Sequence, residues 1–199
     1  EAEANSRLEE QALTGGVSFD VGDLKAYPID GEDDKVILPE SILMDLSNLD
    51  VFGKGPVLLR LFKQDGKYTH VGIREFSAPP GMIGVPEKVV FTLTGGDLAK
   101  DIYAGCDKED LVTKSKALKE KIGGSLSVKY VTMPKVTYAK LQPLHNSFSN
   151  VKPVKDMLEE NLRFHSTLSV GDLLAVWYRG VSYSLRVCEI KPQDFGSLV

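Results

Sequence analysis

Cysteine, histidine and tryptophan are scarce in this sequence, which has two, three and one of them in 199 residues. Cys106 and Cys188 lie far apart, and His70, His145 and His165 fall in different segments. The pattern therefore lacks both the paired spacing of a disulfide framework and the spacing of a zinc site. We expect no metal, no cofactor and a reducing intracellular compartment.

A long apolar run and an excess of basic residues are also missing. The formal net charge is −4, and no apolar stretch approaches the roughly 20 residues that a membrane-spanning helix needs. We expect neither membrane insertion nor nucleic-acid binding, because no basic stripe is present. Residues 1–16 lack the basic and apolar regions of a signal peptide. The helical spacing of Leu8, Ala12 and Leu13 predicts an N-terminal helical extension there.

Catalytic motifs fail at decisive positions. The glycine-rich residues 53–56 lack the Gly-Lys-Ser/Thr ending of a phosphate loop. Residues 180–184 miss the last glycine of a nucleophile elbow. The acidic neighbours of Cys106, among them Asp107 and Glu109, oppose a reactive thiolate. The sequence therefore predicts no catalytic residue, and we expect that the protein is not an enzyme.

An internal repeat relates residues 38–46 to residues 85–93. Each copy reads apolar, Pro, Glu, one variable residue, three apolar residues, one polar residue and Leu. A proline favours an extended conformation in the residue before it and suits the first turn of a helix. The following glutamate lies where the helix dipole favours negative charge. Each copy therefore predicts the end of a strand followed by a short helix.

Each copy of the repeat is followed by a strand pattern, at residues 56–63 and 125–132. The first continues through an Asp-Gly turn into a further strand at 68–76. Two similar halves predict a barrel with pseudo-two-fold symmetry. The second connection is much longer, so we interpret residues 95–124 as an insertion. A helix is predicted within it at 107–122.

The predicted insertion helix has few apolar residues and is flanked by glycines. We expect it to pack only lightly against the barrel, through Leu111, Leu118 and Ile122.

The last third of the chain predicts a smaller α/β unit. Residues 137–150 are polar and rich in turn formers, which indicates a connector. A helix is expected from Pro153, followed by strands at 173–179 and 181–190. Trp177 and Tyr178 are adjacent on the first of these strands. Because successive strand side chains face opposite ways, one is expected to pack inward and the other to be available for binding.

Several short segments, taken in order, resemble the N-terminal domain of the ubiquitin fusion degradation protein 1 family. These proteins are adaptors of the segregase AAA ATPase (valosin-containing protein). The segments are Lys-Val-Ile-Leu-Pro-Glu-Ser (35–41), Thr-His-Val-Gly-Ile-Arg-Glu-Phe (69–76), Val-Thr-Tyr-Ala-Lys-Leu-Gln-Pro (136–143), Leu-Ser-Val-Gly-Asp (168–172) and Glu-Ile-Lys-Pro (189–192). The resemblance covers about residues 17–199.

The resemblance implies an α+β fold in two parts, similar to the N-domain of segregase AAA ATPases. A double-psi β-barrel is expected over residues 17–138, with 1–16 as an extension before it and 95–124 as an insertion. A small α/β subdomain is expected over 139–199. Further strands follow in the family, so we expect this subdomain to be incomplete.

The implied function is that of an adaptor domain that binds ubiquitin and polyubiquitin in ubiquitin-dependent protein degradation, including ER-associated degradation. We expect it to act in the cytoplasm or nucleus, at the ER surface. Contacts with the ATPase and its partner cofactor are expected in segments outside this chain. The candidate ubiquitin contacts are Trp177 or Tyr178, whichever faces outward, with Glu189 nearby on the adjoining strand.

Three alternatives remain open. A divergent paralogue could serve protein translocation across an organelle membrane, the domain could be the substrate-recognition N-domain of an AAA ATPase, or an enzyme could be built on the same barrel.

Overall fold

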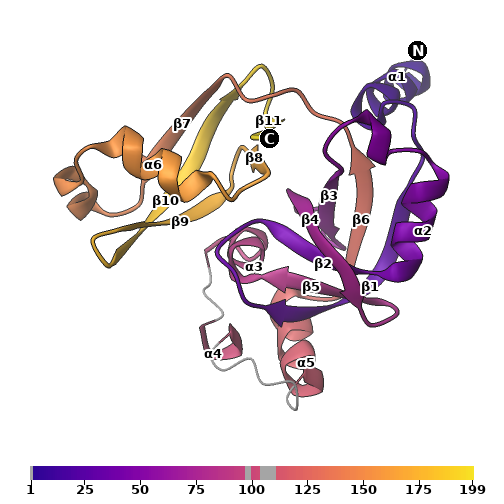
Figure 1. Cartoon of the computed structure of the whole chain (residues 1–199), viewed down its shortest axis with the longest axis horizontal. Coiled ribbons are helices and arrows are strands. Elements are labelled where there is room, and N and C mark those ends of the chain that lie inside the picture. Colours follow the sequence, from indigo (N-terminus) through magenta and orange to yellow (C-terminus); the bar gives the residue numbers. More distant parts are fainter. Residues whose placement is uncertain (1, 97–99, 104–110) are drawn as a thin grey trace.

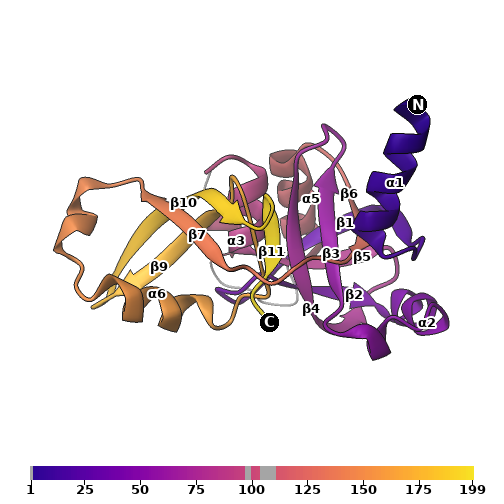
Figure 2. The same cartoon turned by 90° about the horizontal axis from the view of Figure 1, so that it is seen from above.

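The computed structural model describes residues 2–96, 100–103 and 111–199 of the chain. This part forms a mixed α and β structure with two lobes, one around a barrel and a smaller one beside it (Figures 1 and 2). No helix among the described residues has the length and apolar character needed to cross a bilayer. The barrel strands are β1 (Asp20–Ile29), β2 (Lys35–Pro39), β3 (Leu58–Lys63), β4 (Tyr68–Ala78), β5 (Met82–Pro86) and β6 (Leu126–Val131).

The barrel has the pseudo-two-fold symmetry that the internal repeat predicts. Its strands close in the order β1-β5-β2-β4-β3-β6. The pairs β1–β5 and β2–β4 are parallel, and the other four pairs are antiparallel. Exchanging β1 with β4, β2 with β5 and β3 with β6 reproduces every one of these pairings. The central pair, β2 with β5, meets at Ile37 and Gly84.

The two copies of the repeat form the same local structure. The first leads from β2 into α2 (Glu40–Asn48), and the second from β5 into α3 (Glu87–Leu93). Pro39 and Pro86 both stand directly before their helix in an extended conformation, with φ and ψ of −72° and 154° and of −74° and 159°. The surroundings differ, because α2 presents Met44 to solvent whereas residues 88–93 of α3 are all buried.

Helix α5 (Leu111–Ile122) belongs to the barrel core. Leu118 and Ile122 are completely buried in the main hydrophobic cluster, and Ser115 Oγ donates a hydrogen bond to the carbonyl of Ala26 in β1 at 2.8 Å. Our expectation of light packing is therefore wrong, because this helix covers β1 and closes one side of the core. Cys106 and the predicted helix start at 107–110 lie outside the described residues.

Two further helices pack against the barrel. The short helix α4 (Lys100–Tyr103) is attached to β5 by a hydrogen bond that the Tyr103 hydroxyl donates to the carbonyl of Val85 at 2.8 Å. The expected N-terminal helix is α1 (Ala2–Thr14), whose Leu13 carbonyl accepts a hydrogen bond from the N–H of Thr132 at 2.8 Å. A turn of 3-10 helix, η1 (Phe52–Lys54), precedes β3.

The smaller lobe is built on a sheet of order β7-β10-β9, formed by β7 (Tyr138–Pro143), β9 (Leu173–Tyr178) and β10 (Val181–Lys191). Its core cluster includes residues of all three strands, of α6 (Val154–Leu162) and of the 3-10 helix η3 (Asn146–Asn150). A separate two-stranded sheet pairs β8 (Thr167–Ser169) with β11 (Phe195–Ser197). We propose that the lobes divide near residue 138, with residues 1–16 as an extension.

Residues 137–150 are not the plain connector that their polarity suggested, because they contain β7 and η3. Strand β7 is an edge strand, and only Ala139 and Leu141 turn toward the core, where they are partly buried. With only two of its side chains partly buried, this strand has too short an alternation of apolar and polar residues to be recognised in the sequence.

Helix α5 should contribute to global stability. Leu118→Ala is expected to lower the free energy of unfolding by about 2–5 kcal/mol, because it removes a completely buried side chain from the core. The exposed residue Lys116 on the same helix supplies the control, and Lys116→Ala should change stability by less than about 0.5 kcal/mol. Urea denaturation followed by circular dichroism measures both. Equal stability of the Leu118→Ala variant and the parent would show that α5 is not part of the core.

Candidate functional site

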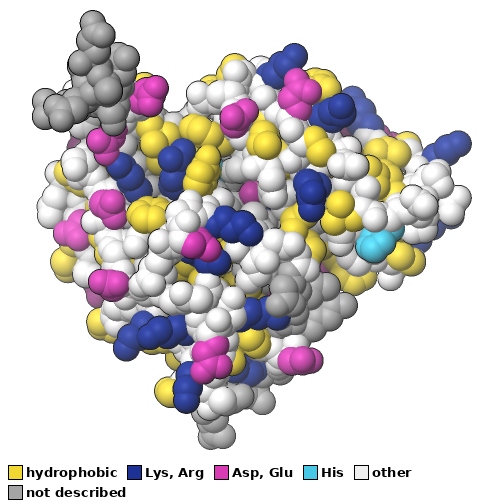
Figure 3. Space-filling model, turned by 180° about the vertical axis from the view of Figure 1, so that it is seen from behind, with side chains coloured by type: hydrophobic (Ala, Val, Ile, Leu, Met, Phe, Trp, Pro, Cys, Tyr) yellow, Lys and Arg dark blue, Asp and Glu magenta, His cyan; other side chains and the backbone are white. Residues whose placement is uncertain are grey.

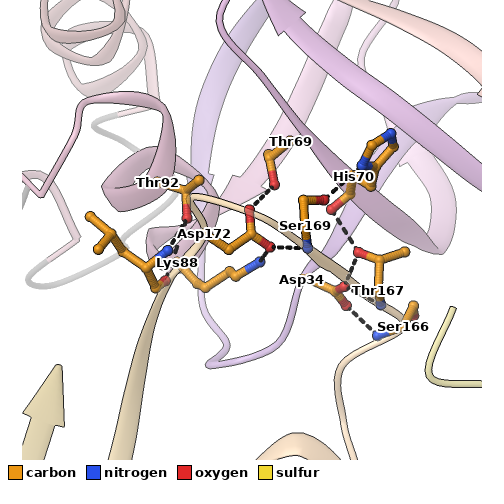
Figure 4. A network of polar contacts seen from close by, with 10 residues as sticks. Asp34, Thr69, His70, Lys88, Thr92, Ser166, Thr167, Ser169 and Asp172 are labelled. Carbon is orange, nitrogen blue, oxygen red and sulfur yellow. Dashed lines mark hydrogen bonds and ion pairs between the residues drawn. The ribbon is translucent and has the colours of Figure 1, made fainter. Parts of the chain in front are cut away.

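The two lobes are joined by buried polar contacts, drawn in Figure 4. Asp34, directly before β2, is completely buried. Its carboxylate accepts hydrogen bonds from the N–H groups of Ser166 and Thr167 and from the Thr167 hydroxyl, each at 2.8 Å. Gly72 lets β4 approach closely here, since a β-carbon at that position would lie 2.4 Å from Ser166 Oγ. The barrel thus supplies a buried carboxylate, and the smaller lobe supplies the hydrogen-bond donors for it.

A second carboxylate makes the reciprocal contact. Asp172 precedes β9 and accepts hydrogen bonds from the Thr69 hydroxyl at 2.8 Å, from Lys88 Nζ at 3.1 Å and from the N–H of Ser169 at 3.2 Å. Lys88 belongs to α3, and both side chains of this ion pair are almost fully buried. Such a pair fixes the position of one lobe against the other, because separating the two charges would leave each of them buried and uncompensated in a medium of low dielectric constant.

His70 lies in the same interface and is held neutral. Arg60 Nε donates to its Nε2 at 3.1 Å, so its Nδ1 carries the proton and donates to Ser169 Oγ at 2.7 Å. Burial, and then the positive charges of Arg60 and Lys88, lower the pKa of His70 to about 3. The ring also packs against that of Phe195, with centroids 4.6 Å apart. His70 therefore packs between the lobes as a neutral ring and does not take up a second proton near neutral pH.

A groove runs between the lobes beside this interface. It consists of two hollows, of about 320 and 220 Å³, which share Glu32, Ala175 and Trp177. The first is also lined by Asp33, Glu160, Asn161, Arg163, Phe164 and His165, and the second by Gly31, Glu87, Lys88, Phe91, Ser182 and Ser184. Among the described residues no cluster of three or more His, Cys, Asp or Glu side chains could hold a metal ion. The hollowed shape and mixed polar and apolar lining of the groove make it a candidate surface for binding.

Trp177 is the outward member of the aromatic pair on β9. It is 45% exposed at the groove. Tyr178 is half-buried against the core of the smaller lobe, and its hydroxyl donates to the carbonyl of Lys152 at 2.7 Å. The alternation expected from the sequence thus assigns Trp177 to the surface and Tyr178 to the core.

Glu189 does not lie beside Trp177, so this part of the expectation is wrong. Trp177 is opposite Ser182 on β10, whereas Glu189 lies near the other end of that strand and pairs with Lys140 of β7. At about 3.3 Å per residue the separation along β10 is roughly 20 Å. Glu189 instead forms an exposed ion pair with Lys191 at 3.7 Å. Adjoining strands do not imply adjacent residues, because the register of the hairpin sets the distance.

The carboxylates that do lie at the groove come from three distant segments: the loop before β2, α3 and α6. Glu32, Glu87 and Glu160 form no ion pair with any other described residue, whereas Asp33 is paired with Arg74 at 2.9 Å. The sequence offered no signal for this grouping, since no motif joins these segments. The face of the molecule in Figure 3 mixes acidic and basic side chains without an extended region of one sign.

His165 also lines the groove. It is only 5% exposed, and burial lowers its pKa. Its neighbours in sequence, Ser166 and Thr167, are drawn inward by Asp34, which explains why a polar segment is buried.

The buried ion pair gives a first prediction for the site. Asp172→Ala should lower the free energy of unfolding by roughly 3–5 kcal/mol, because Lys88 is left charged and buried without a partner. Combining Asp172→Leu with Lys88→Met should recover most of this loss. The exposed pair Lys155–Glu159 is the control, and Glu159→Ala should cost less than about 1 kcal/mol. Urea denaturation distinguishes these outcomes, and similar effects of the two single alanine substitutions would contradict the assignment.

The protonation of His70 predicts a dependence of stability on pH. The unfolded chain binds a proton on this residue near pH 6.5, whereas the folded protein binds it only near pH 3. Between these values the unfolded state holds more protons, so the free energy of unfolding falls as the pH falls. His70 should account for a loss of roughly 1–2 kcal/mol between pH 7 and pH 5. Unfolding measured at both pH values should show that His70→Gln reduces the loss by that amount; an unchanged slope would exclude His70 as its source.

Comparisons with known proteins match two segments of the chain. The family model described as "Ubiquitin fusion degradation protein UFD1, N-terminal subdomain 1" matches residues 21–99. The model for N-terminal subdomain 2 of the same protein matches residues 135–199. Residues 100–134, which include α5, lie between the two matched segments.

The chain is also similar to curated proteins. The "Ubiquitin recognition factor in ER-associated degradation protein 1" of human and of mouse is 31% identical over 166 residues, which is 83% of this chain and 45% of each relative. "Ubiquitin fusion degradation protein 1" of Saccharomyces cerevisiae is 28% identical over 161 residues, which is 80% of this chain and 37% of that protein. The chain thus spans less than half the length of these relatives. With both N-terminal subdomains matched in order, the resemblance found in the sequence is confirmed, and the chain belongs to the ubiquitin fusion degradation protein 1 family.

Proposed function

We propose that this chain is a non-catalytic adaptor domain that binds ubiquitin in ubiquitin-dependent protein degradation, including degradation at the ER. The names of its relatives, a ubiquitin recognition factor in ER-associated degradation and ubiquitin fusion degradation proteins, support the process. The family also supports the topology of a double-psi barrel like that of AAA ATPase N-domains, which is compatible with the closed and pseudo-symmetric strand order. Contacts with the ATPase and its partner cofactor would lie in segments outside this chain.

The observation that carries the proposal is the position of Trp177. A large aromatic side chain, 45% exposed at a groove with carboxylates around it, has the character of a binding anchor. Ubiquitin offers an apolar patch rimmed by positive charge. Glu32 and Glu160 are placed to face such a rim, and they take the role that the sequence had suggested for Glu189. Rim charges of this kind aid association, whereas the aromatic anchor supplies most of the affinity.

The affinity for one ubiquitin should be low, with a dissociation constant of roughly 0.1–1 mM, which corresponds to about −5 kcal/mol. A single exposed aromatic side chain with a few carboxylates makes a small interface. Chains of ubiquitin should bind more tightly if two sites engage together, because the second contact is then intramolecular.

Trp177→Ala should weaken binding of ubiquitin at least tenfold, because it removes the anchor. Isotope-labelled ubiquitin titrated with the protein and followed by NMR measures this change. Tyr138→Ala is the matched control, since Tyr138 is equally exposed, at 46%, on the same lobe but away from the groove. Equal loss in both variants would remove Trp177 from the role of anchor, and the absence of any shift with ubiquitin or its chains at millimolar concentration would refute ubiquitin binding itself.

A further inference from the structure

The free edge of β9 is covered at two places by side chains. Strand β9 has β10 on one side only. On the other side, Asn161 accepts from the N–H of Trp177 at 2.8 Å and donates to its carbonyl at 3.1 Å. The Thr92 hydroxyl makes the same kind of contacts with the N–H and carbonyl of Leu173, at 3.2 and 3.4 Å. Two side chains thus stand where a neighbouring strand would bind.

Ala175 lies between these two positions and has no such cover. In an antiparallel pair, alternate residues turn their N–H and C=O groups away from the partner strand. Leu173 and Trp177 do so, and the register between β9 and β10 is unbroken, so Ala175 does the same. It is exposed, it lines both hollows of the groove, and its outward backbone groups have no hydrogen-bond partner among the described residues. The groove therefore contains one open unit of a strand edge.

The groove also holds polar atoms that lack partners. Two side-chain atoms of the described residues are buried without a hydrogen bond, Glu87 Oε1 and His165 Nδ1, and both residues line the groove. Buried polar atoms are rarely left without a partner in folded proteins, so each calls for an explanation such as a ligand or water. Their occurrence together here is independent of the open edge of β9, and it points to the same place.

The charge of the groove indicates what would fill it. Glu32, Glu87 and Glu160 are carboxylates without an ion pair in the described structure, and they face a single unpaired cation, Arg163. Lys88, the other cation of the lining, is already paired with Asp172. An occupant with basic side chains would therefore find unpaired carboxylates in the groove beside β9.

We propose that the groove binds an extended segment of a partner protein in which apolar and basic residues alternate. Its main chain would form hydrogen bonds with the N–H and carbonyl of Ala175, as in the addition of a strand to a sheet edge. Alternation places basic side chains on one side, toward the carboxylates, and apolar ones on the other, beside Trp177. Thr92 and Asn161 limit the pairing to about one residue, so the side chains decide which segment binds. This inference goes beyond ubiquitin binding and does not require it.

The test is an NMR titration of the isotope-labelled protein with a short capped peptide of alternating valine and arginine. We expect a downfield shift of the Ala175 amide proton and slower exchange of that proton with solvent. A peptide of alternating valine and glutamate should bind at least tenfold more weakly. The arginine peptide with N-methylated valines, which has lost main-chain donors, should also bind at least tenfold more weakly. An Ala175 amide that does not respond, or equal binding of the arginine and glutamate peptides, would overturn the proposal.

Variants of the protein test the contributions of the carboxylates and of the strand edge separately. Glu32→Gln combined with Glu160→Gln should weaken binding of the arginine peptide at least fivefold, whereas Glu120→Gln on the exposed face of α5 should have no effect. Ala175→Pro removes the outward N–H, and proline is tolerated at a strand edge whose N–H faces solvent. It should weaken binding at least tenfold. Binding unaffected by these substitutions would refute the site. Ubiquitin binding without peptide binding would contradict this inference alone, and the reverse result would contradict only the proposed function.

Discussion

Two buried carboxylates, Asp34 and Asp172, determine how the halves of the molecule fit together. A carboxylate removed from water is costly unless hydrogen bonds replace its hydration. Asp34 belongs to the barrel and receives its donors from the smaller lobe, while Asp172 belongs to the smaller lobe and receives two of its three from the barrel. Separating the lobes would strip both groups at once. The groove between the lobes therefore has fixed walls, because Glu32 lies two residues before Asp34 and β9 begins directly after Asp172.

The elements of the barrel could be predicted because their signals are local. The proline and glutamate of each repeat copy mark the change from strand to helix within a few residues, and Pro39 and Pro86 indeed occupy equivalent positions. The alternation of Trp177 and Tyr178 is equally local, and it correctly implied that one faces solvent. Patterns of this kind are set by residues that are neighbours in the sequence, so they can be recognised without knowing which distant residues come into contact.

The groove could not be predicted, because its residues meet only after folding. Glu32 and Glu160 are separated by most of the chain, and no pattern in either segment refers to the other. The burial of His165 depends on Asp34, more than a hundred residues away. Helix α5 was underestimated for a related reason: its few apolar residues suggested a weak contact, but Leu118 and Ile122 complete a core whose other members come from many strands. The composition of a helix shows how much apolar surface it can bury, but not which other residues that surface packs against.

The unequal surroundings of α2 and α3 mean that the two halves of the barrel differ in how they tolerate substitution. Their backbones are equivalent, yet the smaller lobe covers α3 and leaves the outer face of α2 in solvent (Figure 1). The repeat pairs exposed Ser41 with Lys88, which is buried in an ion pair, and exposed Met44 with buried Phe91. Substitutions should therefore accumulate first at the exposed positions of α2, and the sequence similarity between the two helices would be lost there. The repeat would persist longest at Pro39 and Pro86, because these prolines stand at equivalent positions of the backbone.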